Sequence, residues 1–264
     1  MSLSARLAVL VLAAILPLVA ALAVAQRGLY RDQEADVRAE VLHQVRLLAG
    51  ELSQLVDGIR QIQAVLVEMP AIRDGDAAGC TEILARVIDG NGLLNNLLVA
   101  DRRGRLVCDG VHQPADLAPY TVADRDYFRD ARRTGAFAAG TYSIGRSTGA
   151  AVVHFASPIV DDVGRFQGVV ITALDLQALG ARLGREPWSV DHATLVTDRV
   201  GTILLRHPDN EAYVGRRMTP TLLALLDDPE PGTADVSGTV DGCLASSATS
   251  RRRPTTPAST SASA

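Results

Sequence analysis

A short sequence pattern that occurs twice is the strongest constraint on the fold of this 264-residue chain. Residues 99–106 read VADRRGRL and residues 196–203 read VTDRVGTI, so Val, Asp, Arg and Gly recur in the same places and Leu or Ile closes each copy. Each copy predicts a β-hairpin, because Asp starts a tight turn and Gly supplies the positive φ that the turn needs. Two such hairpins indicate two modules of the same kind.

An uninterrupted apolar run at residues 7–25 predicts attachment to a membrane. At about 1.5 Å per residue, the run is long enough to cross the hydrocarbon core of a bilayer. We therefore expect residues 1–6 in the cytoplasm, a single transmembrane helix at 7–25 in the bacterial inner membrane, and the bulk of the chain in the periplasm or outside the cell. The alternative is a cleaved signal peptide, since Ala23-Val24-Ala25 resembles a cleavage site, and it too would export the chain.

Residues 26–70 predict a long helix of the dimerisation type. Apolar residues recur at alternating steps of four and three from Val41 to Met69, which is the spacing of a coiled-coil seam, and Pro70 ends the pattern. This spacing favours a homodimer formed through the helix. The alternative is a helix that lies on the domain behind it.

Composition and motifs exclude several classes of function. The net charge of −4 does not suit a nucleic-acid partner. The chain contains no motif of a hydrolase, kinase or nucleotide cyclase, so we expect no enzyme activity, no catalytic residue and no cofactor. The three cysteines have no metal-binding spacing, so we expect no metal site. In an oxidising periplasm, Cys80 and Cys108 are a disulfide candidate, with two free thiols as the alternative.

In their order along the chain, these features resemble the double Cache sensory region of bacterial membrane-bound histidine kinases, diguanylate cyclases and chemoreceptors. The resemblance covers residues 27–242 and is supported by DRDYF at 124–128, GTYSIG at 140–145, HFASPIVDD at 154–162 and GRFQGVVITALDL at 164–176. It implies an α+β fold, with a long N-terminal helix and two PAS-like (Cache) modules built on antiparallel sheets. The membrane-distal module would span residues 71–185 and the membrane-proximal module residues 186–243.

The second module lacks the room for its last strands, so we expect it to be incomplete. Residues 244–264 are rich in Ser, Thr, Ala and Pro, cannot build a core, and are expected to be disordered. The chain would then be a receptor truncated before its effector.

Residues 120–149, which are rich in Arg, Tyr and Gly, are the candidate ligand site. An arginine such as Arg125 can bind a carboxylate through two parallel hydrogen bonds, although a structural ion pair with a neighbouring Asp is the alternative. Tyrosines offer a hydroxyl on an apolar body, with core packing as the alternative. The candidate ligand-binding residues are Tyr120, Arg125, Tyr127, Tyr142, Arg146 and Asp175.

The resemblance sharpens the choice of ligand. Double Cache receptors for amino acids carry Tyr, Arg and Ala at the spacing of Tyr120, Arg125 and Ala131. Their Trp-Tyr pair and first Asp are replaced here by Tyr127, Phe128 and Ile144, and their last Asp, counted from Gly168, falls on Ala173 rather than on Asp175. The half of the motif that binds a carboxylate is thus mostly kept, and the half that binds an ammonium group is largely lost.

We therefore expect the extracytoplasmic sensing region of a transmembrane signalling protein, with a small organic acid, another anion or an amino-acid-like molecule as its ligand. The alternatives are a membrane-anchored binding or scaffold protein without signalling, and a non-functional fragment of a truncated receptor.

Overall fold

The computed structural model describes residues 42–117, 120–184, 194–223, 232–236 and 245–249. The expected transmembrane helix at 7–25 lies outside these ranges. Within them, no helix combines the length and the apolar character needed to cross a bilayer.

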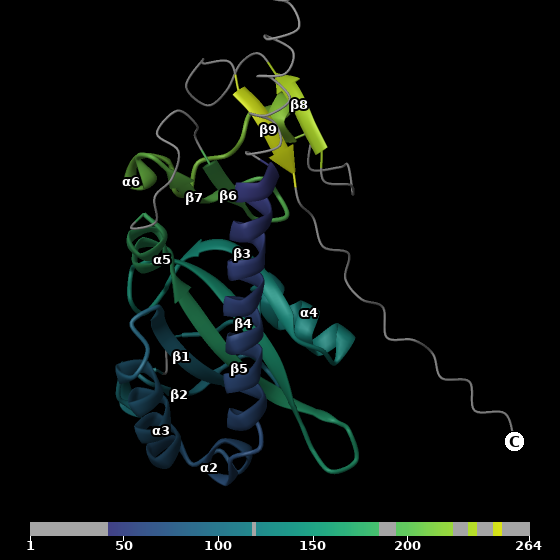
Figure 1. Ribbon diagram of the computed structural model, residues 1–264. Coiled ribbons are helices and arrows are strands. Elements are labelled where there is room, and N and C mark those ends of the chain that lie inside the picture. Colours follow the sequence, from purple (N-terminus) through teal and green to yellow (C-terminus); the bar gives the residue numbers. More distant parts are fainter. Residues whose placement is uncertain (1–41, 118–119, 185–193, 224–231, 237–244, 250–264) are drawn as a thin grey trace, which may run out of the picture. The chain divides into compact units, whose positions relative to one another are not determined.

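A five-stranded antiparallel sheet forms the centre of the first module (Figure 1), in the order β2-β1-β5-β4-β3. Strand β5 lies between β1 and β4, and Val169, Val170 and Ile171 on it are fully buried. Its apolar run is continuous rather than alternating because both faces of the sheet are covered. The strands are β1 (Leu94–Asp101), β2 (Leu106–Asp109), β3 (Ala138–Ile144), β4 (Ala151–Val160) and β5 (Phe166–Asp175).

The long helix, described over residues 42–66, packs on one face of this sheet with its C-terminal half. Gln63 is fully buried; its Nε2 donates to the carbonyl oxygen of Phe155 at 2.8 Å and to Thr172 Oγ1 at 2.9 Å. Ile59 and Leu66, one turn to either side, are buried as well. Part of the expected dimer seam is therefore used within the chain, as the alternative interpretation proposed. Dimer formation through the rest of the helix stays a prediction.

The other helices of the first module begin and end at residues whose side chains explain the boundaries. The carboxylates of Asp76 and Asp175 accept hydrogen bonds from the first backbone N–H groups of α3 and α5. Helix α4 ends at Gly135, which has a left-handed φ of 65°. These elements are α2 (Pro70–Arg73), α3 (Ala77–Asp89), the 3₁₀ turn η1 (Pro114–Asp116), α4 (Asp126–Thr134) and α5 (Leu176–Leu183).

The second module opens with a hairpin of the same chemistry as the first. In one turn Asp101 Oδ1 accepts from the backbone N–H groups of Arg103 and Arg105, and in the other Asp198 Oδ1 accepts from Val200 and Thr202. The turn glycines, Gly104 and Gly201, have φ values of 80° and 77°. The repeated pattern therefore forms the repeated structure that it predicts. The hairpin strands and the helices that follow are β6 (Thr194–Thr197), β7 (Ile203–His207), α6 (Asn210–Tyr213) and α7 (Pro220–Leu223).

The C-terminal segment contains a strand that the sequence did not predict. Strand β8 (Gly232–Val236) pairs with β9 (Ala245–Thr249) in a separate two-stranded sheet, and disorder of the rest of residues 244–264 stays a prediction. Pairing of this kind uses backbone N–H and C=O groups, which a segment of Ala, Ser and Thr supplies as well as any other. The remainder of the expected tail lies outside the described residues.

Candidate functional site

A cavity of about 30 Å³ opens on the face of the sheet opposite the long helix. Its floor comes from alternate residues of the sheet, including Asn96 and Leu98 on β1, His154 on β4 and Ala173 on β5. Its walls come from the loop at 145–148 and from five residues of the segment before and at the start of α4: Tyr120, Thr121, Val122, Arg125 and Tyr127. The cavity holds little more than a water molecule, so a larger ligand requires the walls to move.

Arg125 lines this cavity from the residue immediately before α4. Its Nη2 lies 3.5 Å from the carbonyl oxygen of Ile144, a long contact. The expected alternative, a structural ion pair with Asp124, Asp126 or Asp130, is not present among the described residues, since those carboxylates bind other arginines. The guanidinium thus remains available to an anion in the cavity.

Arg146 forms part of the opposite wall and is held by an internal carboxylate. Its Nη1 and Nη2 donate to Asp124 Oδ1 and Oδ2 at 2.9 and 2.5 Å, and this contact holds the pKa of the Asp124 carboxyl at about 2. Arg125 occupies the capping position of α4, and the carboxylate of Asp124, one residue earlier, reaches across to the loop. Nη1 also donates to the carbonyl oxygen of Thr121, so three hydrogen bonds hold Arg146 here although both side chains of the ion pair are substantially exposed.

The residues that line the cavity include two arginines and no Asp or Glu. Arg146 is balanced by Asp124, whereas Arg125 offers its charge and its N–H donors to the cavity.

His154 also lines the cavity, although it is not among the candidate ligand-binding residues chosen from the sequence. It is 6% exposed, its ring stacks on that of Tyr127 with 4.8 Å between centroids, and its Nδ1 lies 3.1 Å from Ser143 Oγ. Burial, helped by the positive charge of Arg125, lowers the pKa of the imidazole to about 4. The ring is therefore neutral at neutral pH.

Two adjacent asparagines at the cavity are not among the candidate residues either. Asn95 and Asn96 interrupt an apolar strand, which is the signal that could have found them. Asn95 Oδ1 accepts from Thr148 Oγ1 at 2.6 Å, and Asn96 Nδ2 donates to the buried Asp109 at 2.9 Å. These bonds fix β1 to the loop and hold the floor of the cavity in place.

The structure brings four of the six candidate ligand-binding residues together at the cavity: Tyr120, Arg125, Tyr127 and Arg146. Burial strongly raises the pKa of Tyr127, so its phenol stays protonated. Tyr142 and Asp175 do not line the cavity. The hydroxyl of Tyr142 lies against Gly215 of the second module, and Asp175 caps α5 while accepting from Asn95 Nδ2 at 3.1 Å.

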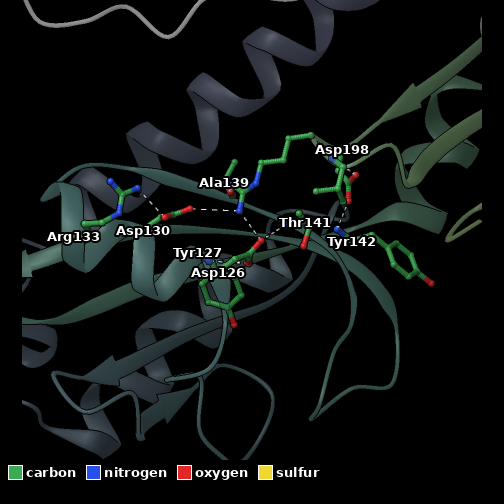
Figure 2. Close-up of polar contacts among 10 residues, drawn as sticks. Asp126, Tyr127, Asp130, Arg133, Ala139, Thr141, Tyr142 and Asp198 are labelled. Carbon is green, nitrogen blue, oxygen red and sulfur yellow. Dashed lines mark hydrogen bonds and ion pairs between the residues drawn. The ribbon is translucent and has the colours of Figure 1, made fainter. Parts of the chain in front are cut away.

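The turn of the second hairpin contacts the first module beside the cavity (Figure 2). Arg199 Nη2 donates to Asp126 Oδ2 and its Nη1 to the carbonyl oxygen of Ala139, both at 2.9 Å. Asp198 Oδ2 accepts from the backbone N–H of Tyr142, also at 2.9 Å. Asp126 directly precedes Tyr127 of the cavity wall, so the second module is fastened to the start of α4.

The Cys80 and Cys108 side chains are joined by a disulfide, with 6.0 Å between their Cα atoms. It fastens α3 to β2, the edge strand of the sheet. Leu106, which begins that strand, lines the cavity.

A family model described as a Cache domain matches residues 27–257. No curated protein sequence matches the chain.

Solved structures with the same fold include three that are named as ligand-binding or sensor domains. The extracellular domain of the putative histidine kinase rpHK1S-Z16 is 18% identical over 82% of this chain and 88% of that one, with a TM-score of 0.60. The ligand-binding domain of the Pseudomonas aeruginosa PAO1 amino acid chemoreceptor PctC, in complex with GABA, is 21% identical over 76% of this chain and 89% of that one, with a TM-score of 0.56.

The third is an extracellular ligand-binding receptor from Desulfohalobium retbaense DSM5692, 16% identical with a TM-score of 0.60. The match covers 74% of this chain and 35% of that receptor's length. At these identities the likeness establishes the fold alone.

Proposed function

Because the chain belongs to the Cache family, whose members are extracellular, non-catalytic sensor regions of membrane receptors, we propose that it senses a small carboxylate or another small anion in the cavity of the first module. The observation that carries this proposal is Arg125, which faces a cavity lined by no acidic residue and has no carboxylate partner among the described residues.

In this proposal, the carboxylate of the ligand binds Arg125 bidentately. Arg146 swings from Asp124 and the carbonyl oxygen of Thr121 to admit the ligand and then faces its other side, exchanging these hydrogen bonds for bonds to the anion. The ligand would pull the start of α4 toward the loop at 145–148. Arg199 would pass that displacement to the second module, because it binds Asp126 directly.

We also propose that residues 7–25 anchor the chain in the bacterial inner membrane and that a homodimer forms through the long helix. Val45, Leu52 and Leu55, half-buried residues of the expected seam, leave apolar surface on this helix for a partner. Sedimentation of the detergent-solubilised chain, with and without Val45→Glu, measures this: the substitution should shift dimer to monomer. A monomeric wild-type chain would contradict it.

The ligand class is tested by isothermal titration of the full chain in detergent with propionate and with alanine, which differ only in the α-amino group. We expect propionate to bind and alanine to bind at least about tenfold more weakly, because the ammonium group meets Arg125 without a carboxylate to balance it.

Variants identify the site. Arg125→Ala should abolish binding of the acid, whereas Arg129→Ala, on the exposed side of α4 one turn later, should leave it unchanged. Tight binding of alanine that survives Arg125→Ala would overturn the proposal.

A further inference from the structure

The ring of His154 is held from two directions. Tyr127 stacks on its face, and Ser143 Oγ lies at hydrogen-bond distance from Nδ1. His154 also lines the cavity, and among the described residues Ser143 is the only polar group bonded to the ring. The second ring nitrogen, Nε2, is therefore the polar atom left for a ligand.

A neutral imidazole carries one N–H, and its position is set by the bond at the other nitrogen. When Ser143 donates to Nδ1, the proton is on Nε2, which then donates to a ligand oxygen. When Nδ1 donates to Ser143, Nε2 accepts from a ligand hydroxyl. A purely apolar ligand tail would leave Nε2 buried without a partner, which is unfavourable.

The dimensions of the cavity limit the ligand. Arg125 lies on the wall of the cavity while His154 and Ala173 form its floor, so a molecule bound at Arg125 as the walls open lies over these two residues. Ala173 is paired in register with His154, so on β5 only a methyl group lies opposite the imidazole, and the polar group nearest the carbon next to a bound carboxylate is the ring itself.

We propose that His154 is the specificity-determining residue of this pocket: its Nε2 binds an oxygen on the carbon next to the carboxylate, and the ligand is a short 2-oxo or 2-hydroxy acid. This inference rests on the proposed function, since it takes the anion to be bound at Arg125.

The test compares three acids of equal length: propionate, which has no oxygen at C2, pyruvate, which has a keto group there, and lactate, which has a hydroxyl. Each is titrated calorimetrically into the full chain in detergent. Pyruvate or lactate should bind about tenfold more tightly than propionate, because only they pair with Nε2.

Two substitutions separate the ring nitrogens. His154→Asn keeps a polar atom near the position of Nδ1 and removes Nε2, so it should abolish the preference for the C2 oxygen while propionate still binds. His154→Gln places its amide near Nε2 and should restore part of the preference. Thermal unfolding shows whether each variant folds. The two variants make separate predictions, so either one alone can contradict the proposal.

The outcomes distinguish the two proposals. If all three acids bind equally, or if the preference survives His154→Asn, the role of His154 is wrong while the carboxylate site stands. If none of the acids binds to the wild-type chain, the proposed carboxylate site is wrong, and the role proposed for His154 is wrong as well.

Discussion

His154 is buried against Tyr127, and its protonation makes the unfolding free energy of the protein depend on pH. The ring titrates at about pH 4 in the folded protein and near its ordinary pKa of 6.5 in the unfolded chain. Between these values the unfolded chain binds the proton and the folded protein does not. Stability must therefore fall as pH falls from about 6.5 to about 4, and His154 contributes no such dependence above that window.

His154→Phe, which keeps an aromatic ring beside Tyr127 but cannot titrate, isolates this effect. Relative to the variant, the wild type should lose about 2 kcal/mol of unfolding free energy between pH 7.5 and pH 5. Urea denaturation of both proteins across that range measures the difference. The two carboxyls whose pKa is held at about 2, Asp124 and Asp161, are common to both and cancel. Parallel pH curves would show that the imidazole is not buried neutral.

Sequence reasoning found Arg125, Tyr127 and Arg146 because charged and aromatic residues in a Gly-rich stretch stand out. It could not find His154 in the same way. Strand β4 has apolar residues on both faces, so alternation does not tell which face a residue occupies. Only the pairing of β4 with β5, His154 opposite Ala173, puts the imidazole on the cavity side.

At the scale of elements, Gln63 joins the long helix to the sheet. Its side chain makes three hydrogen bonds with β4 and β5: two donated to Phe155 O and Thr172 Oγ1, and one accepted from Ser157 Oγ at 2.7 Å. Gln63→Ala should lower the unfolding free energy by about 3 kcal/mol, because it leaves buried polar groups unpaired. Gln61→Ala, exposed on the same helix, should change it by less than about 0.5 kcal/mol. Chemical denaturation measures both, and equal effects would contradict this role.

The seam of this helix also shows a limit of pattern reading. A spacing of four and three predicts an apolar stripe, and the stripe was found, with Ile59 and Leu66 buried. The spacing does not say whether a second helix or a sheet covers the stripe. The partners of the polar Gln63, which lies outside the stripe, could be found only in the folded chain.

The second hairpin carries an arginine whose role can be separated from that of its counterpart. Arg199 and Arg102 occupy equivalent places in the two repeats, but Arg199 binds Asp126 and Ala139 whereas Arg102 is exposed. Arg199→Ala should lower the melting temperature by about 2–4 °C, the effect of losing about 1 kcal/mol in a domain of this size. Arg102→Ala is the matched control and should leave it unchanged. Scanning calorimetry measures both melting temperatures. An equal shift for the two variants would show that Arg199 does not join the modules.

For the whole molecule, the Cys80–Cys108 disulfide closes a loop with a sequence separation of 28. On the loop-entropy account, such a link stabilises the folded chain by about 3–4 kcal/mol. In a Cys243→Ser background, guanidinium denaturation should show a lower midpoint when reductant is added. The midpoint of the Cys80→Ala/Cys108→Ala double variant should not change with reductant. If the midpoint of the chain that keeps both cysteines does not change either, the disulfide is absent in solution.

At this scale, the two-module organisation could be predicted because the same turn chemistry occurs twice. The contact between the modules could not, because the Asp-Arg dipeptide of the turn is identical in both hairpins and only one of them has α4 beside it. Strand β9 was missed for a related reason: a Ser- and Ala-rich segment becomes a strand only when a partner such as β8 offers its backbone.

The bond between Arg199 and Asp126 also governs how sensors of this kind can be recombined (Figure 2). A chimera that joined this first module to the second module of another receptor would naturally be cut after α5, where the five-stranded sheet is complete. That cut separates Asp126 from its arginine and the backbone N–H of Tyr142 from Asp198. A working hybrid must therefore take residues 198 and 199 from the same parent as α4 and β3, even though the join lies elsewhere in the sequence.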